Sequence, residues 1–218
     1  MPDYGLGRLE APDARDEAFP LRALLPAAPS PRTHKYWWPS GWWGDQGALP
    51  WCVAYSWRHW VEDGPVAAPG HPSDVELRDA YHWMQLNDEW PGTDYDGTSV
   101  RAGAKFWQER GVIGEYRWAW TLDTVVQALL EAGPVVLGTN WYSGMFTPDR
   151  DGIIRPTGSL AGGHAYLANG VNVDRNLVRI KNSWGRSWGR RGYAWLPFGS
   201  LERLLIEDGD ACMPLAAG

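Results

Sequence analysis

The sequence predicts an α+β protein with two lobes, one helical and one built from strands, and a cleft between them. In the first half of the chain, apolar residues such as Val53, Trp57 and Trp60 recur at the spacing of an amphipathic helix. Beyond Gly133-Pro134 the period changes, and short apolar runs between turns indicate strands. Helices followed by strands along one chain are typical of an α+β architecture.

Start and stop signals mark the expected helices. Pro50 lacks a backbone donor and suits a helix entrance, Ser73 and Glu76 form a capping box, and Gly111 closes a later helix. The helix after Ser73 should bury a stripe made of Val75, Ala80, Tyr81 and Met84. The expected helices cover 52–63, 73–87, 100–110 and 121–132, and the expected strands cover 135–138, 164–171, 177–181 and 193–196.

The chain should divide into an N-terminal arm and one domain. Residues 1–35 are rich in Pro, Ala, Asp and Arg and show little periodicity, so we expect an irregular arm there. The domain should then cover 36–218, with a helical lobe over about 45–120 and a β lobe over about 134–210. A length of 218 residues is enough for one such domain with a substantial core.

Composition excludes several function classes. The net charge of −6, with no basic run longer than Arg190-Arg191, argues against nucleic acid as a partner. No apolar stretch approaches membrane-spanning length and the N-terminus has no signal-peptide pattern, so we expect a cytoplasmic protein that does not bind membranes. Two cysteines, Cys52 and Cys212, cannot form a disulfide framework, which suits a reducing compartment. The histidines lack metal-ligand spacing, so neither a metal nor another cofactor is expected.

Cys52 is the candidate nucleophile. It lies in the first turn of the expected helix, where unpaired amide groups favour a thiolate. Gln46 precedes it by six residues and carries an amide donor for an oxyanion. His164 follows a glycine pair at the start of a buried strand, and Asn182 ends the next strand. A cysteine, a base and an orienting residue are the parts of a thiol nucleophile, although each residue alone has an ordinary structural explanation.

Taken together, these residues resemble the papain-like (C1) cysteine peptidases of bacterial or phage type. The matching blocks are Gln46-Gly47, Cys52-Val53-Ala54-Tyr55-Ser56, Gly163-His164-Ala165 and Lys181-Asn182-Ser183-Trp184-Gly185-Arg186-Ser187-Trp188-Gly189-Arg190-Arg191-Gly192-Tyr193. The resemblance implies the papain-like fold with an antiparallel β-sheet or barrel lobe. It also implies hydrolysis of protein or peptide substrates through an acyl-enzyme.

The resemblance also implies residue roles. Cys52, His164 and Asn182 would form the catalytic triad, with Gln46 as the oxyanion donor. Trp184 would shield the bond between His164 and Asn182 from water. Gly97, Gly163 and Trp184 would line the cleft and bind substrate, although Gly97 fits equally well as an ordinary turn glycine. A long helical propeptide, usual in this family, is not expected in the arm, and neither is activation by its removal.

Departures from the family pattern leave a second function open. Pro50-Trp51 stands where the family has small residues before the nucleophile, so Trp51 either contacts substrate or packs against the aromatic cluster Trp37, Trp38, Trp42 and Trp43. We expect the packing. The alternative function is a papain-fold binding or structural component of a larger bacterial or phage assembly with little turnover, which would be virion-associated if phage-encoded.

Overall fold

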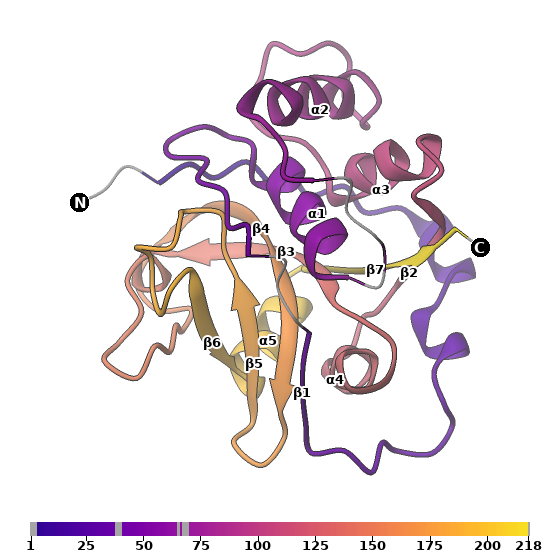
Figure 1. Cartoon of the computed structure of the whole chain (residues 1–218), viewed down its shortest axis with the longest axis vertical. Coiled ribbons are helices and arrows are strands. Elements are labelled where there is room, and N and C mark those ends of the chain that lie inside the picture. Colours follow the sequence, from indigo (N-terminus) through magenta and orange to yellow (C-terminus); the bar gives the residue numbers. More distant parts are fainter. Residues whose placement is uncertain (1–3, 38–40, 65, 67–69, 218) are drawn as a thin grey trace.

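The computed structural model describes residues 4–37, 41–64, 66 and 70–217, which form one antiparallel sheet with helices on both faces (Figure 1). The strand order is β2-β7-β3-β4-β5-β6, and β1 pairs with β4 outside this path. The strands are β1 (His34–Tyr36), β2 (Ile113–Trp118), β3 (Val135–Tyr142), β4 (Leu160–Asn172), β5 (Leu177–Lys181), β6 (Tyr193–Pro197) and β7 (Asp210–Ala216). The predicted α+β architecture with two lobes is confirmed.

The helices divide between the two faces of the sheet. Helices α1, α2 and α3 pack on one face and α4 and α5 on the other (Figure 1). Their bounds are α1 (Cys52–Asp63), α2 (Asp74–Leu86), α3 (Val100–Glu109), α4 (Leu122–Glu131) and α5 (Phe198–Ile206), with 3-10 turns at Ala14–Ala18, Leu21–Leu24 and Ser143–Met145. Among the described helices, none is long and apolar enough to cross a membrane.

Alternation along the central strands separates the two cores. Val136 of β3 and Leu167 of β4 belong to the cluster under α1, α2 and α3. Their neighbours Leu137 and Tyr166 point to the other face and join the cluster under α4 and α5. Successive side chains of a strand point to opposite faces, so β3 and β4 supply both cores and hold the two lobes together.

The helix predictions match the structure closely, and the strand predictions are incomplete. The capping box of Ser73 and Glu76 opens α2 as expected. Val75, however, is an exposed side chain, so its place in the buried stripe is wrong; Leu77 lies in the core instead. Strands β1, β2 and β7 and helix α5 lie outside the predicted elements, and β3 and β4 are longer than expected.

The N-terminal arm contacts the domain in three ways. Leu21 and Leu25 are buried in the core under α4 and α5, and β1 pairs with β4. Residues 4–9, which we call the cleft segment, run between the helical lobe and the sheet. In Figure 1 the indigo chain passes from the left edge behind α1 to the right-hand side. This segment lies directly over the predicted site.

Candidate active site

Cys52 begins α1, as the sequence predicts. Trp51 is the N-cap residue, so the cysteine lies in the first turn, where backbone N–H groups have no partner within the helix. The Sγ atom accepts a hydrogen bond from the N–H of Ala165 on β4, at 3.4 Å. This bond joins the start of α1 to the residue that follows His164. The thiol is fully buried.

His164 is held in a defined tautomer by Asn182. The two side chains meet at 2.8 Å between Nε2 and Oδ1. Because the amide oxygen only accepts, Nε2 carries the proton and Nδ1 has the free lone pair. Nδ1 is buried and lacks a hydrogen-bond partner among the described residues. An unpaired basic nitrogen in the interior, next to the residue that touches Cys52, is well placed to accept the thiol proton.

Two tryptophans enclose the imidazole. The ring of Trp184 stacks on that of His164 with centroids 4.6 Å apart and planes inclined by 20°. Trp141 meets the same ring edge-on at 4.8 Å. Both indoles are buried, so they keep water from the bond to Asn182. The shielding by Trp184 was expected, whereas Trp141 was missed because the predicted strand ended at Gly138.

Gln46 is positioned by the block that follows Asn182. Its Oε1 accepts from Ser183 Oγ at 2.6 Å, and its backbone N–H donates to the Ser183 carbonyl at 2.8 Å. The side-chain Nε2 donates to the carbonyls of Leu49 and of Gly5, at 2.6 and 3.1 Å. Gln46 thus presents its amide donor to a peptide carbonyl of the cleft segment. Ser183, which fixes this amide, carried no assigned role in the sequence analysis.

The cleft segment pairs with both lobes through its backbone. The N–H groups of Gly7 and Arg8 both donate to the Gly163 carbonyl of β4 at 3.0 Å. On the helical side, Thr98 donates to the Gly7 carbonyl and accepts from the Leu9 N–H, each at 2.9 Å. The segment therefore binds as an extended peptide would, with hydrogen bonds on two sides.

Two glycines allow the close approach of this segment. A Cβ atom at Gly5 would overlap the backbone carbonyl of Leu49, and one at Gly7 would overlap that of Pro50. Both carbonyls belong to the loop that enters α1. Only residues without a side chain fit this close to backbone atoms.

Gly97 has a different role from the one expected. Its N–H donates to Tyr81 Oη at 2.7 Å, so this backbone group is bonded to α2 and does not pair with the segment. The pairing falls to Thr98, one residue later. Gly97 still abuts the segment, because a Cβ there would lie 2.5 Å from the Gly7 carbonyl oxygen, and its φ of +102° favours glycine. Gly163 accepts hydrogen bonds from the segment, and its expected contact with substrate stays a prediction.

Trp51 packs in a different place from the one expected. Its ring lies 5.9 Å from that of Tyr81 on α2, and it borders the core of the helical lobe. Trp42 instead stacks on Tyr55 at 5.9 Å, and the Trp37 indole donates to the Leu129 carbonyl at 3.1 Å. Trp38, named in the same expected cluster, lies outside the described residues. Among the described residues, the ring partner of Trp51 is therefore Tyr81 of α2, and no ring contact joins it to Trp37, Trp42 or Trp43.

Burial dominates the electrostatics of the covered site. It raises the pKa of the Cys52 thiol to about 12, although the Ala165 N–H acts in the other direction. It lowers the pKa of His164 to about 4, against the opposing hydrogen bond to Asn182. Both groups are therefore neutral at pH 7 while the segment covers the site, in contrast to the thiolate expected at the start of the helix. Burial without water disfavours two charges more than the helix terminus favours one.

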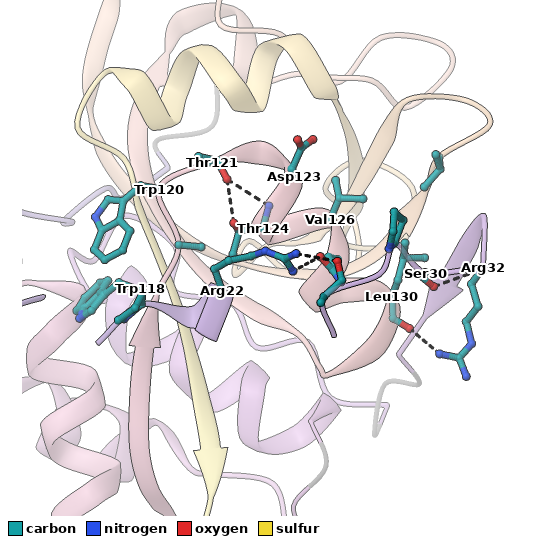
Figure 2. A pocket seen from close by; sticks show the side chains of 16 residues that line it. Arg22, Ser30, Arg32, Trp118, Trp120, Thr121, Asp123, Thr124, Val126 and Leu130 are labelled. Carbon is teal, nitrogen blue, oxygen red and sulfur yellow. Dashed lines mark hydrogen bonds between the residues drawn. The ribbon is translucent and has the colours of Figure 1, made fainter. Parts of the chain in front are cut away.

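Other candidate sites lack comparable chemistry. A pocket of about 760 Å³ lies against α4 and is lined in part by Arg22, Trp120, Thr121 and Asp123 (Figure 2). Neither Cys52 nor His164 lines it. Within the described ranges, no three His, Cys, Asp or Glu side chains gather as a metal site would require.

A comparison with known families identifies the family to which this chain belongs. The model of the papain family of cysteine proteases matches residues 97–210, just over half of the chain and the part that contains His164 and Asn182. The chain belongs to this family. Gln46 and Cys52 precede the matched range.

One curated relative extends the match. It is an uncharacterized peptidase C1-like protein of Acanthamoeba polyphaga mimivirus, 26% identical, and the alignment covers 71% of this chain. The same alignment covers 63% of the viral protein, so the chain spans about three fifths of that relative's length.

Solved structures share the fold. Xylellain, a cysteine protease from Xylella fastidiosa, superposes with a TM-score of 0.76 at 22% identity, covering 100% of this chain and 98% of that protein. The digestive procathepsin L2 of Tenebrio molitor gives 0.67 at 17% identity, covering 98% and 78%. The Carica candamarcensis protease CMS1MS2, in complex with E-64, gives 0.61 at 17% identity, covering 86% and 100%. The papain-like fold is thus shared over almost the whole chain.

Proposed function

We propose that this protein is a thiol peptidase that hydrolyses peptide bonds through Cys52, His164 and Asn182. One observation carries the proposal: Asn182 holds His164 Nε2 at 2.8 Å, which leaves Nδ1 buried and unpaired among the described residues, while the next residue, Ala165, donates its N–H to Cys52 Sγ. A base with a fixed tautomer and no other partner is what a thiol nucleophile requires.

The first half of the reaction forms a thioester. The Cys52 thiol gives its proton to His164 Nδ1, and the resulting thiolate attacks the carbonyl carbon of the peptide. Gln46 Nε2, which donates to the Gly5 carbonyl in the covered site, would donate to the developing oxyanion together with the Cys52 N–H. The C–N bond then breaks as His164 returns the proton to the leaving amine.

The second half releases the acyl group. Water enters where the amine has left and gives a proton to His164 Nδ1 as its oxygen attacks the thioester carbon. The C–S bond breaks, the sulfur recovers a proton from His164, and the carboxylic acid product leaves. Asn182 keeps the imidazole aimed through both halves, because its oxygen accepts the same N–H throughout.

Names of the similar proteins support this reaction class. The mimivirus relative is described as peptidase C1-like, and xylellain as a cysteine protease. The Carica protease is in complex with E-64. We infer that the substrates of the present chain are proteins or peptides.

Labelling with E-64 tests the proposal in the Gly5→Ala chain, where a methyl group would overlap the Leu49 carbonyl and displace the cleft segment. The expected result is one adduct, mapped by peptide mass spectrometry to Cys52, together with hydrolysis of a fluorogenic peptide library. Cys52→Ala should lose both signals. Cys212→Ser is the matched control, because Cys212 is also a fully buried free thiol and lies on β7. An adduct at Cys212 alone, or hydrolysis that survives Cys52→Ala, would contradict the assignment.

A second candidate function has its own support. Cys52 and His164 are both fully buried in the presence of the cleft segment, as they would be in a papain-fold binding or structural protein without turnover. Releasing the segment distinguishes the peptidase function from the binding or structural function. If a chain with a weakened segment is labelled by E-64 and cleaves peptides, the peptidase function is supported. If that chain folds but is neither labelled nor active, the binding or structural function is supported instead.

A further inference from the structure

Arg8 of the cleft segment is a buried arginine bound to a carboxylate. Its side chain is 2% exposed, and its Nε and Nη2 atoms each lie 2.8 Å from Asp210 Oδ2. Nη2 also donates to the Asp208 carbonyl at 2.6 Å. Asp210 begins β7, and four fifths of its side chain is buried. The segment therefore anchors itself through one specific, desolvated ion pair.

Two glycines of the sheet leave room for this side chain. A Cβ atom at Gly138 would lie 3.0 Å from Arg8 Cγ and 3.0 Å from Asp210 Oδ2. One at Gly163 would lie 3.3 Å from Arg8 Cδ. Val100 of α3 closes the opposite side, since the same Cβ at Gly138 would meet its Cγ2 at 2.5 Å. These residues form a slot between α3 and the sheet, with the carboxylate at its end.

The backbone groups that hold Arg8 would hold any extended peptide. Gly163 accepts from the Arg8 N–H, and Thr98 bonds the residues on either side of Arg8. These backbone groups lie on the two sides of the segment and do not select for a particular side chain. A peptide that replaces the segment with the same pairing places its own side chain in the slot, three residues from the carbonyl that Gln46 binds.

We propose that Asp210 makes this slot a selective subsite for a basic side chain of the bound peptide, arginine ahead of lysine, and that Arg8 occupies it as an internal ligand. The inference rests on the proposed function in taking the bound peptide to be the substrate. Arginine is favoured because its planar guanidinium reaches the carboxylate and the Asp208 carbonyl at once. An acidic side chain would place a second negative charge beside Asp210 and is excluded.

Protection of Cys52 from alkylation measures the selectivity without turnover. The protein is the Arg8→Gln chain, in which the internal ligand is weakened, with Arg8→Met as the substitute if that variant does not fold. Hexapeptides Tyr-Gly-Leu-Gly-X-Leu, which copy residues 4–9 with Arg, Lys, Gln or Glu at X, are added before iodoacetamide. We expect the Arg peptide to protect Cys52 at about tenfold lower concentration than the Gln peptide, and the Glu peptide not to protect.

Two matched substitutions of acidic residues test whether Asp210 causes the advantage of the Arg peptide. Asp210→Asn, added to Arg8→Gln, should remove the advantage of the Arg peptide. Asp208→Asn makes the same charge change two residues away, but the contact there is a backbone carbonyl that asparagine retains. It should keep the advantage. Equal protection by the Arg and Gln peptides, or an advantage that survives Asp210→Asn, would overturn the proposal.

Hydrolysis of the same peptide series, extended on both sides, separates this inference from the proposed function. Selective protection without any cleavage would leave the subsite standing and reject the peptidase. Cleavage with no preference for a basic residue at any position would confirm a peptidase and reject the subsite.

Discussion

The ring of Tyr4 stacks on the ring of Trp184, with centroids 4.4 Å apart and planes inclined by 15°. Trp184 in turn stacks on His164, and its Nε1–H donates to the Gly5 carbonyl at 3.3 Å. Trp184, which shields the proposed catalytic histidine, is therefore also a binding surface for the N-terminal segment. Because the same tryptophan contacts both, loss of the segment changes the surroundings of the histidine directly.

We predict that displacing the segment exposes Cys52 to alkylation. In Gly5→Ala the new methyl group would overlap the Leu49 carbonyl, so the segment cannot keep its present position. Water then reaches the thiol, its pKa falls from the covered value of about 12, and iodoacetamide at pH 7 should react at least about tenfold faster. Peptide mapping of the adduct gives the rate.

Gly199→Ala is the control for that substitution. A Cβ atom at Gly199 has no other atom within 4 Å, and the residue lies in α5, away from the segment. Its alkylation rate at Cys52 should equal that of the unchanged chain. A Gly5→Ala protein that folds and reacts no faster would mean that the segment does not limit access.

Substitutions in the triad should rank by role. Cys52→Ala removes the nucleophile and His164→Ala removes the base, so each should abolish peptide hydrolysis. Asn182→Ala should leave a measurable rate, because it orients the imidazole without transferring a proton. Hydrolysis of the best library peptide is the readout, and thermal melts check that each variant folds. Equal losses in all three, with unchanged melts, would contradict the ranking.

Preference for a basic side chain should depend on pH. Burial raises the pKa of Asp210 to about 6, with Glu10 acting in the same direction and Arg8 and Arg101 acting against them. Above this value the carboxylate is charged and binds a guanidinium; below it the protonated acid loses that attraction. The ratio of kcat/KM for Arg over Gln peptides should therefore fall as pH drops from 7.5 to 5. A flat ratio would contradict the role of Asp210.

The proposed catalytic residues could be selected from the sequence because each lies in a recognisable local context. Cys52 is marked by a proline-bearing helix entrance, and His164 and Asn182 by strand ends, so each local signal survives in the fold. The packing partner of Trp51 could not be predicted from the sequence in this way. Several aromatic residues were available, and only the packing of α1 against α2 selects Tyr81.

The contacts of residues 4–9 could not be predicted from local sequence patterns. Gly5 and Gly7 look like ordinary turn glycines, and the groups that bind the segment, Thr98 and Gly163, are about ninety and more than one hundred and fifty residues away. The shift of backbone pairing from Gly97 to Thr98 has a similar cause. Tyr81 of α2 takes the Gly97 N–H, and this contact depends on how α2 sits.

Trp51→Ser should lower stability, because the indole borders the core of the helical lobe and packs with Tyr81. The side chain is only partly buried, so the loss should be smaller than for a fully buried tryptophan, at about 1–3 kcal/mol. Tyr81 also holds Gly97, so the rate of peptide cleavage should fall in parallel. Denaturant unfolding and turnover are the measurements. An unchanged melt with faster cleavage would instead place Trp51 in the substrate's path.

The ion pair between Lys181 and Asp63 should be the most sensitive electrostatic contact in the fold. Both side chains are fully buried, with Nζ 2.8 Å from Oδ1, and Asn169 donates to the other carboxylate oxygen at 2.9 Å. The pair joins the last residue of α1 to the last residue of β5, so it connects the two lobes at the opposite end of α1 from Cys52.

Asp63→Ala should reduce the free energy of unfolding by about 3–5 kcal/mol at pH 7, because it leaves a buried ammonium without its counter-charge. Asp79→Ala, which breaks the exposed pair with Arg78, is the control and should change it by less than about 1 kcal/mol. Burial already lowers the pKa of Lys181 and Asp63 opposes this, so the variant's lysine should lose its proton more readily. The unfolded chain then binds more protons than the folded one, and the deficit should shrink as pH rises from 7 to 10. A deficit that stays constant over that range would show that lost packing, and not the unpaired charge, causes it.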